Sequence, residues 1–129
     1  MALTPGSGTW ASLSDRNAKT DIGPLDDDSI LAKVAALPID AWQYKSEKGV
    51  RHVGPMAQDF YAAFGTGVDN RHITSIDEDG VALAAIKSLD TKLGQVHREN
   101  GRLASQLRQL AAKNAALERR LDALAARRP

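Results

Sequence analysis

The C-terminal stretch that decides the fold, residues 86–124, reads IKSLDTKLGQVHRENGRLASQLRQLAAKNAALERRLDAL. Apolar residues and two asparagines recur there at alternating spacings of three and four, the a/d seam of a coiled coil. The intervening residues are good helix formers, so one narrow apolar stripe remains and partner helices are needed to cover it. The seam comprises Ile86, Leu89, Leu93, Val96, Asn100, Leu103, Leu107, Leu110, Asn114, Leu117, Leu121 and Leu124.

Two polar layers interrupt this seam at Asn100 and Asn114. Each buried leucine contributes roughly 1.5–3 kcal/mol, which outweighs the cost of these layers, and the asparagines are expected to fix the register. In a parallel assembly Lys113 faces Glu118 of the next chain. Leucine at a with leucine and valine at d leaves two or three strands open, while asparagine at a favours two.

The residues before the seam predict a compact α+β head of short elements, so the fold class is α+β, a small head followed by a long C-terminal helix. Asp26 to Asp28 provide N-cap chemistry for a helix that stops at Pro38, and two alternating runs around Gly49 form a hairpin. The expected elements are a linker over 1–8, strands over 9–13, 39–45, 50–53 and 72–76, helices over 26–37 and 55–64, and a long helix beginning after Gly80.

Composition and charge exclude several classes of protein. The chain has 129 residues and no cysteine, which excludes a large multi-domain enzyme, disulfides and thiolate chemistry. No apolar run approaches the roughly 20 residues of a membrane span, and residues 1–10 lack the pattern of an export signal. The net charge is −5 over residues 1–85 and +6 over 86–129. A basic helical stalk or a nucleic-acid-binding tail would each give this asymmetry.

No metal site or cofactor is predicted. The three histidines have no i, i+4 spacing, and a helix start explains the aspartates at 26–28 better than cation binding. His72 and His97 are expected to be structural or exposed. The aromatic residues are expected in the core or in contacts between chains rather than in a carbohydrate-binding strip; these are Trp42, Tyr44, Phe60, Tyr61 and Phe64.

Ser14 and Lys19 are the residues most suited to chemistry. A serine hydroxyl and a lysine amine can perform acyl transfer without a histidine, provided that the lysine is neutral. Because lysine ordinarily titrates near 10.4, such a base needs burial or nearby positive charge. Taken alone, Ser14-Asp15 is more typical of a helix cap or turn.

Four motifs follow one another before the heptads. They are Ser14-Asp15-Arg16-x-x-Lys19, Ile39-x-x-Trp42-x-Tyr44, Arg51-His52-Val53-Gly54-x-Met56-Ala57-Gln58-Asp59, and Asp79-Gly80-Val81-Ala82-Leu83 running into 84–89. In order and spacing they resemble the peptidase S74 family, the C-terminal intramolecular chaperone domains of phage endosialidases, tail spikes and tail fibres. A related domain occurs in the myelin regulatory factor. The resemblance covers about residues 9–95.

The resemblance implies an intramolecular chaperone that forms a parallel homotrimer, aligns the upstream stalk of its own polypeptide and then releases itself by a single cut. Ser14 would be the nucleophile, Lys19 the general base and Leu13-Ser14 the scissile bond. Asn17, Arg16 or a backbone amide would hold the oxyanion. Asp15 is a possible accessory residue, and His52 would either assist Ser14 or pack within its hairpin. Cleavage would follow assembly if a neighbouring chain covers Lys19.

On this interpretation the chain has three parts. Residues 1–13 are a linker and the end of the upstream stalk, 14–85 are the self-cleaving head, and 86–129 are the trimerisation stalk. Fibre assembly would take place in the cytoplasm of the phage host, and the passenger would join the virion tail. No nucleic acid and no membrane are expected as partners.

Two alternatives remain. The first is a non-cleaving trimerisation or capping module, in which Ser14 and Lys19 are ordinary surface residues. The second is a zipper-type nucleic-acid binder, suggested by the basic C-terminal part. That alternative is weaker because Asp77, Glu78 and Asp79, rather than a basic block, precede the heptads.

Overall fold

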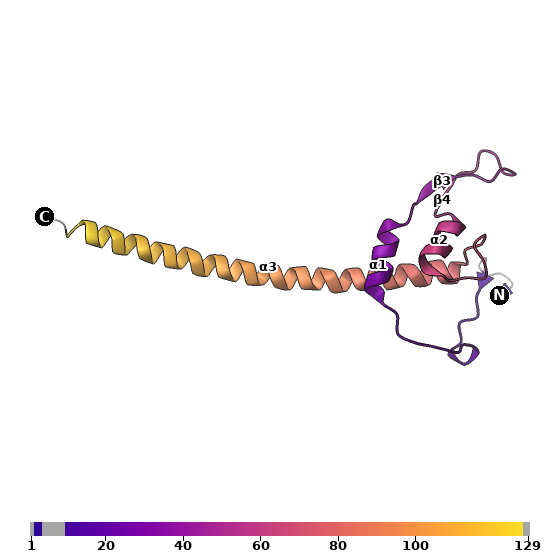
Figure 1. Ribbon diagram of the computed structural model, residues 1–129, viewed down its shortest axis with the longest axis horizontal. Helices are drawn as coiled ribbons and strands as arrows, with labels where there is room; N and C mark the ends of the chain where they lie inside the picture. Colours follow the sequence, from indigo (N-terminus) through magenta and orange to yellow (C-terminus); the bar gives the residue numbers. More distant parts are fainter. Residues whose placement is uncertain (1, 4–9, 128–129) are drawn as a thin grey trace. The chain divides into compact units, whose positions relative to one another are not determined.

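The computed structural model describes residues 2–3 and 10–127 and has an α+β fold, as the sequence predicts (Figure 1). The chain divides into two units, Met1–Leu89 and Asp90–Pro129. The elements in chain order are β1 (Ala2–Leu3), β2 (Trp10–Ala11), the 3-10 turn η1 (Arg16–Ala18), α1 (Asp27–Ala36), β3 (Asp40–Trp42), β4 (His52–Gly54), α2 (Ala57–Phe64) and α3 (Ser75–Ala125).

Both sheets are small antiparallel pairs. In the first, β1 pairs with β2, so the part of the expected linker that is described forms a strand, while residues 1 and 4–8 lie outside the described residues. Of the expected strand over 9–13, Trp10–Ala11 is observed and residue 9 is not described. In the second, β3 and β4 form the predicted hairpin, with Asp40 opposite Gly54 and Trp42 opposite His52.

The hairpin strands are shorter than expected because the connecting segment uses its own hydrogen bonds. Glu47 N–H donates to the carbonyl of Tyr44 at 3.1 Å, and Gly49 N–H donates to Oε1 of Gln43 at 3.3 Å. Gly49 has a φ of 90°, in the left-handed region that glycine adopts without strain. These contacts end the ladder after three residue pairs.

Helix α1 begins as predicted, with a carboxylate cap. Oδ1 of Asp26 accepts from Ser29 N–H at 3.1 Å, which satisfies one of the unpaired amides of the first turn. The helix ends at Ala36, because the residue before Pro38 is driven out of the helical region; Leu37 is extended.

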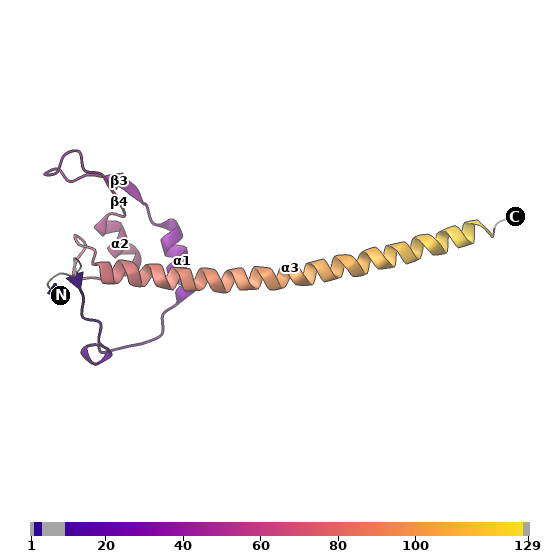
Figure 2. The same ribbon diagram turned by 180° about the vertical axis from the view of Figure 1, so that it is seen from behind.

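Helix α1 packs against the first turns of α3 (Figures 1 and 2). Ile30 lies against Ala84 and Ala85, with Leu31, Val34, Phe64 and Val81 around them. Two polar contacts flank this small core: Lys87 Nζ lies 2.6 Å from Oδ2 of Asp27, and the buried Ser88 hydroxyl donates to Oδ1 of Asp28 at 2.5 Å. The small side chains on this face of α3 let α1 approach closely.

Helix α2 begins two residues later than the sequence suggests. The prediction placed Pro55 at the first helical position, but Met56 is the N-cap with extended backbone, so Pro55 lies outside the helix. Gly65 ends the helix as expected, with a φ of 64° and its N–H donating to Tyr61 at 2.8 Å. Phe60 is buried, and its ring centroid is 4.8 Å from that of Phe64.

The strand predicted over 72–76 is wrong. Residues 72–74 have no regular structure, and α3 begins at Ser75 rather than after Gly80. The reason is a helix cap: the Thr74 hydroxyl accepts from Asp77 N–H at 3.2 Å and donates to Oδ2 of Asp77 at 2.6 Å. The Thr74 side chain therefore satisfies an unpaired amide of the first turn, and the acidic residues of that turn interact favourably with the helix dipole. Gly80 lies within the helix.

The heptad residues of α3 are uncovered in the single chain. Between Leu89 and Leu124 the leucines and valine of the seam have exposed fractions from 44% to 67%. The described part of the chain leaves this stripe exposed, so these side chains are available to partner helices. No helix among the described residues has the length and apolar character that a membrane span requires.

Phe60 should carry much of the stability of the head. Its side chain is only 4% exposed, whereas the neighbouring Tyr61 on α2 is 40% exposed. We expect Phe60→Ala to lower the free energy of unfolding by about 3 kcal/mol, since it leaves a cavity. Tyr61→Ala should cost less than about 1 kcal/mol. Denaturant unfolding of both variants measures this, and equal losses would contradict it.

Candidate active site

A tight turn built by Asp15 positions the predicted catalytic residues. Asp15 is the N-cap of η1, and its Oδ1 accepts from Asn17 N–H at 2.9 Å. Ala18 N–H then donates to the carbonyl of Asp15 at 3.1 Å, and Lys19 N–H to that of Arg16 at 3.2 Å. The capping that Ser-Asp suggests is therefore real, and it is the carboxylate of Asp15 that caps.

The turn brings Ser14 and Lys19 together. Lys19 Nζ donates to Ser14 Oγ at 2.7 Å, a short, charge-assisted hydrogen bond. Both residues are exposed in the single chain. The two atoms are already at the distance that proton transfer from a serine hydroxyl to an amine requires. Proton transfer in that direction needs the amine to be neutral, so that it accepts the hydrogen bond.

A shallow hollow contains this pair. It is lined by Ser14, Arg16, Lys19 and Ile22. Sequence reasoning did not identify Ile22, because one isoleucine in a polar segment has no periodic partner that would mark it. The Leu13 side chain, on the other side of the predicted scissile bond, is 72% exposed. Apolar groups therefore flank the pair without covering it.

The other predicted accessory residues near Ser14 have different surroundings. The side-chain amide of Asn17 donates to Oδ1 of Asp15 at 3.2 Å, so it helps to close the turn. Asp15 itself accepts hydrogen bonds at that turn and has none to Ser14 or Lys19 among the described residues. Arg16 contributes to the hollow.

His52 lies in the hairpin. Its ring stacks on Trp42 at a centroid distance of 4.8 Å and meets Tyr44 edge-on at 5.4 Å. Nε2 is buried without a hydrogen-bond partner among the described residues, and Oε2 of Glu47 lies 4.0 Å away. The structure therefore brings Ser14 and Lys19 together, and gives His52 contacts with the hairpin instead.

The remaining polar clusters have structural partners. Asp26 caps α1, while Asp27 and Asp28 pair with α3. No group of three or more potential metal ligands occurs in the part of the chain that the structure describes.

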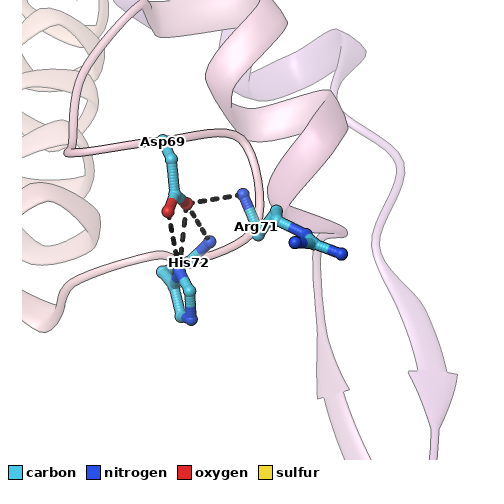
Figure 3. Close-up of polar contacts among 3 residues, drawn as sticks. All are labelled: Asp69, Arg71 and His72. Atoms are coloured by element: carbon cyan, nitrogen blue, oxygen red, sulfur yellow. Dashed lines mark hydrogen bonds and ion pairs between the residues drawn. The ribbon is translucent and has the colours of Figure 1, made fainter.

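His72 belongs to a turn organised by Asp69 (Figure 3). Oδ1 of Asp69 accepts from the N–H groups of Arg71 and His72, at 2.8 and 3.0 Å. Nδ1 of His72 also lies 3.0 Å from both carboxylate oxygens. The backbone hydrogen bond from Arg71, followed by the side-chain contact with His72, lowers the pKa of Asp69 below its ordinary value.

The family comparison agrees with the motifs. Residues 14–69 match the family model Peptidase_S74, described as chaperone of endosialidase. The match confirms the resemblance to this family for the segment that begins at Ser14 and includes η1, α1, the hairpin and α2. It covers less than half of the chain. No curated protein matches the chain.

The Asp69 turn gives a pH-dependent prediction. Because its pKa is lowered in the folded state, the ionised Asp69 carboxylate stabilises the turn at pH values above its ordinary pKa of 3.8. This contribution is lost as the pH falls through the lowered pKa. An NMR titration of the carboxyl carbon should give a midpoint below 3.8. His72→Ala should move it upward, whereas His97→Ala should leave it unchanged. A midpoint at or above 3.8 in the unmutated protein would contradict the assignment.

Proposed function

We propose that this protein is an intramolecular chaperone that cuts itself between Leu13 and Ser14 by means of Ser14 and Lys19. The observation that carries the proposal is the 2.7 Å contact between Lys19 Nζ and Ser14 Oγ. The name of the matched family refers to a peptidase and its description to a chaperone. The match begins at Ser14, the proposed nucleophile. A cut before Ser14 would leave the matched segment intact.

The proposed reaction first forms an ester between Leu13 and Ser14 and then hydrolyses it. Ser14 Oγ bonds to the carbonyl carbon of Leu13, and the neutral amine of Lys19 takes the hydroxyl proton while negative charge develops on the carbonyl oxygen. The carbon–nitrogen bond then breaks, and Lys19 returns the proton to the Ser14 nitrogen, which leaves an ester between Leu13 and Ser14 Oγ. Water hydrolyses the ester to the Leu13 carboxylate and the Ser14 hydroxyl.

Three parallel chains fit the chaperone role. An intertwined stalk needs its strands to meet in register, and a coiled coil supplies a fixed register and a high local concentration. The uncovered seam on α3 supports association, and the family resemblance favours three chains over two. Cleavage after assembly would leave the passenger kinetically trapped in its folded form.

Assembly and cleavage are coupled in this proposal. Ser14 and Lys19 are exposed in one chain, and exposed apolar groups, Leu13 and Ile22, lie beside them. A neighbouring chain that covers these groups would exclude water and favour the neutral amine that the reaction requires.

The passenger is the upstream stalk of the same polypeptide, of the phage tail spike or tail fibre type. Folding would take place in the host cytoplasm, and the passenger would enter the virion tail. No membrane, nucleic acid or cofactor has a role in this mechanism.

A non-cleaving trimerisation module is the second candidate, favoured by the exposure of Ser14 and Lys19. It shares every feature of the first proposal except the cut. The nucleic-acid binder has less support, because the first turn of α3 is acidic. Steeply salt-dependent DNA binding would revive it.

Replacing the two catalytic residues tests the cut directly. Intact mass should reveal a product beginning at Ser14 in the unmutated chain, refolded from denaturant to start the reaction. Ser14→Ala and Lys19→Ala should remain full-length, because each removes a partner of the 2.7 Å contact. Lys33→Ala removes an exposed lysine of α1 and should cut normally. If the unmutated chain stays full-length and is trimeric, self-cleavage is overturned and the non-cleaving trimerisation module is supported.

A substitution in the seam tests the coupling between assembly and cleavage. Leu110→Asp places one carboxylate from each chain in the same layer of the seam and should convert the assembly to single chains, because buried unpaired charges are costly. Cleavage should slow at least tenfold. Ala112→Asp, two residues away on the outer face, should leave both assembly and rate unchanged. Sedimentation and intact mass measure the two properties together, and single chains that cut at the normal rate would show that the coupling is absent.

A further inference from the structure

The guanidinium of Arg16 is the one charged group of the hollow that the two catalytic roles do not use. Arg16 lines the hollow together with Ser14 and Lys19. Its side chain has no hydrogen bond or ion pair within residues 2–3 and 10–127. It follows Ser14 by two positions, at the start of η1. A permanent positive charge thus lies in the same hollow as the nucleophile, with no partner among the residues that the structure describes.

The other nearby donors are engaged elsewhere. The side-chain amide and the backbone N–H of Asn17 both donate to Oδ1 of Asp15. The N–H groups of Ala18 and Lys19 donate to carbonyls within the turn. The nitrogen of Ser14 belongs to the scissile bond itself, so it is the leaving group. These contacts engage Asn17 and the backbone amides of residues 17–19 within the turn, which favours Arg16 as the donor to an oxyanion.

We infer that Arg16 is a catalytic residue whose guanidinium holds the oxygen of the Leu13 carbonyl as it becomes negatively charged. This inference rests on the proposed self-cleavage. When Ser14 Oγ bonds to the carbonyl carbon, the carbonyl π electrons move to the oxygen, and when the carbon–nitrogen bond breaks they return. Arg16 donates hydrogen bonds throughout and exchanges no proton. Its planar, charged donors suit an oxyanion better than a neutral amide does.

The position of Arg16 in the chain is compatible with this contact. Arg16 is three positions after Leu13, a span of at most about 11 Å even in a fully extended chain. The extended backbone of Asp15, followed by the 3-10 turn, bends the chain between them. A long arginine side chain at the start of the turn can therefore reach back toward the preceding peptide. Lys19 stays with Ser14 Oγ, so the two cations have separate tasks.

Single-turnover cleavage of the whole chain tests the inference. The chain is refolded from denaturant, and the product beginning at Ser14 is followed by intact mass over a range of pH. Arg16→Ala and Arg16→Gln should cut about 10²- to 10³-fold more slowly, the usual effect of removing an oxyanion donor. The cleavage rate of Arg16→Lys should fall by less, because lysine keeps the positive charge. Arg108→Gln removes one arginine charge on α3 and should leave the rate unchanged.

Two readouts separate this role from a structural one. Added guanidinium chloride, at concentrations too low to unfold the protein, should accelerate Arg16→Ala, whereas the same concentration of sodium chloride should not. In the Arg16 variants the maximal cleavage rate should be lower than in the unmutated chain. The pH at which the rate is half-maximal should be unchanged, because Arg16 exchanges no proton. Circular dichroism and sedimentation should show an unchanged fold and assembly in Arg16→Gln.

The outcomes are distinct. A normal rate in Arg16→Ala and Arg16→Gln would assign the oxyanion to backbone amides and overturn the role of Arg16 while self-cleavage stands. Slow cleavage without guanidinium rescue and with a shifted pH midpoint would make Arg16 a positioning residue instead. An uncut unmutated chain, matching Ser14→Ala, would overturn the proposed function together with this role.

Discussion

The first turns of α3 bury one face against the head and leave the seam residues of another face exposed. Ala84, Ala85 and Ser88 are buried under α1, while Ile86 and Leu89 point into solvent. Small residues permit the close approach, and the ion pair from Asp27 with the hydrogen bond to Asp28 fixes the register of α1 along α3. Each charged group in that contact has a partner, so the desolvation cost is offset. The head therefore needs little core of its own.

The proposed chemistry depends on a local constraint of a different kind. Asp15 closes a 3-10 turn, and the turn alone brings Lys19 Nζ to Ser14 Oγ. Ser14 and Lys19 are both exposed to solvent. The hydrogen bonds of the turn form within a single chain, so the two side chains can meet before any association. Excluding water from the exposed lysine needs a further surface. In the proposed function, this separation would let the pair form in one chain and react only after a neighbouring chain covers it.

The sequence predicted the elements that depend on local residue types and failed where side chains bond to the backbone of neighbouring residues. α1 and the hairpin were predicted because caps, proline and alternation act locally, and the end of α2 followed from Gly65. The strand expected over 72–76 failed because the Asp69 carboxylate takes the N–H groups of Arg71 and His72 that a ladder would use. Thr74 then caps α3, which begins at Ser75 rather than after Gly80. Side-chain hydrogen bonds to the backbone therefore outweighed the strand that was expected over 72–76.

The sequence by itself determined the heptad seam, the positions of most caps and the family resemblance of residues 14–69, because these properties depend on residue type and short spacing. It also identified Ser14 and Lys19 as a candidate pair. Only the tertiary structure decided that the two side chains meet, that Asn17 is engaged by Asp15, that Arg16 lies in the same hollow and that His52 packs with Trp42. The reason is that a contact depends on where the backbone turns and on which competing donors and acceptors are already occupied.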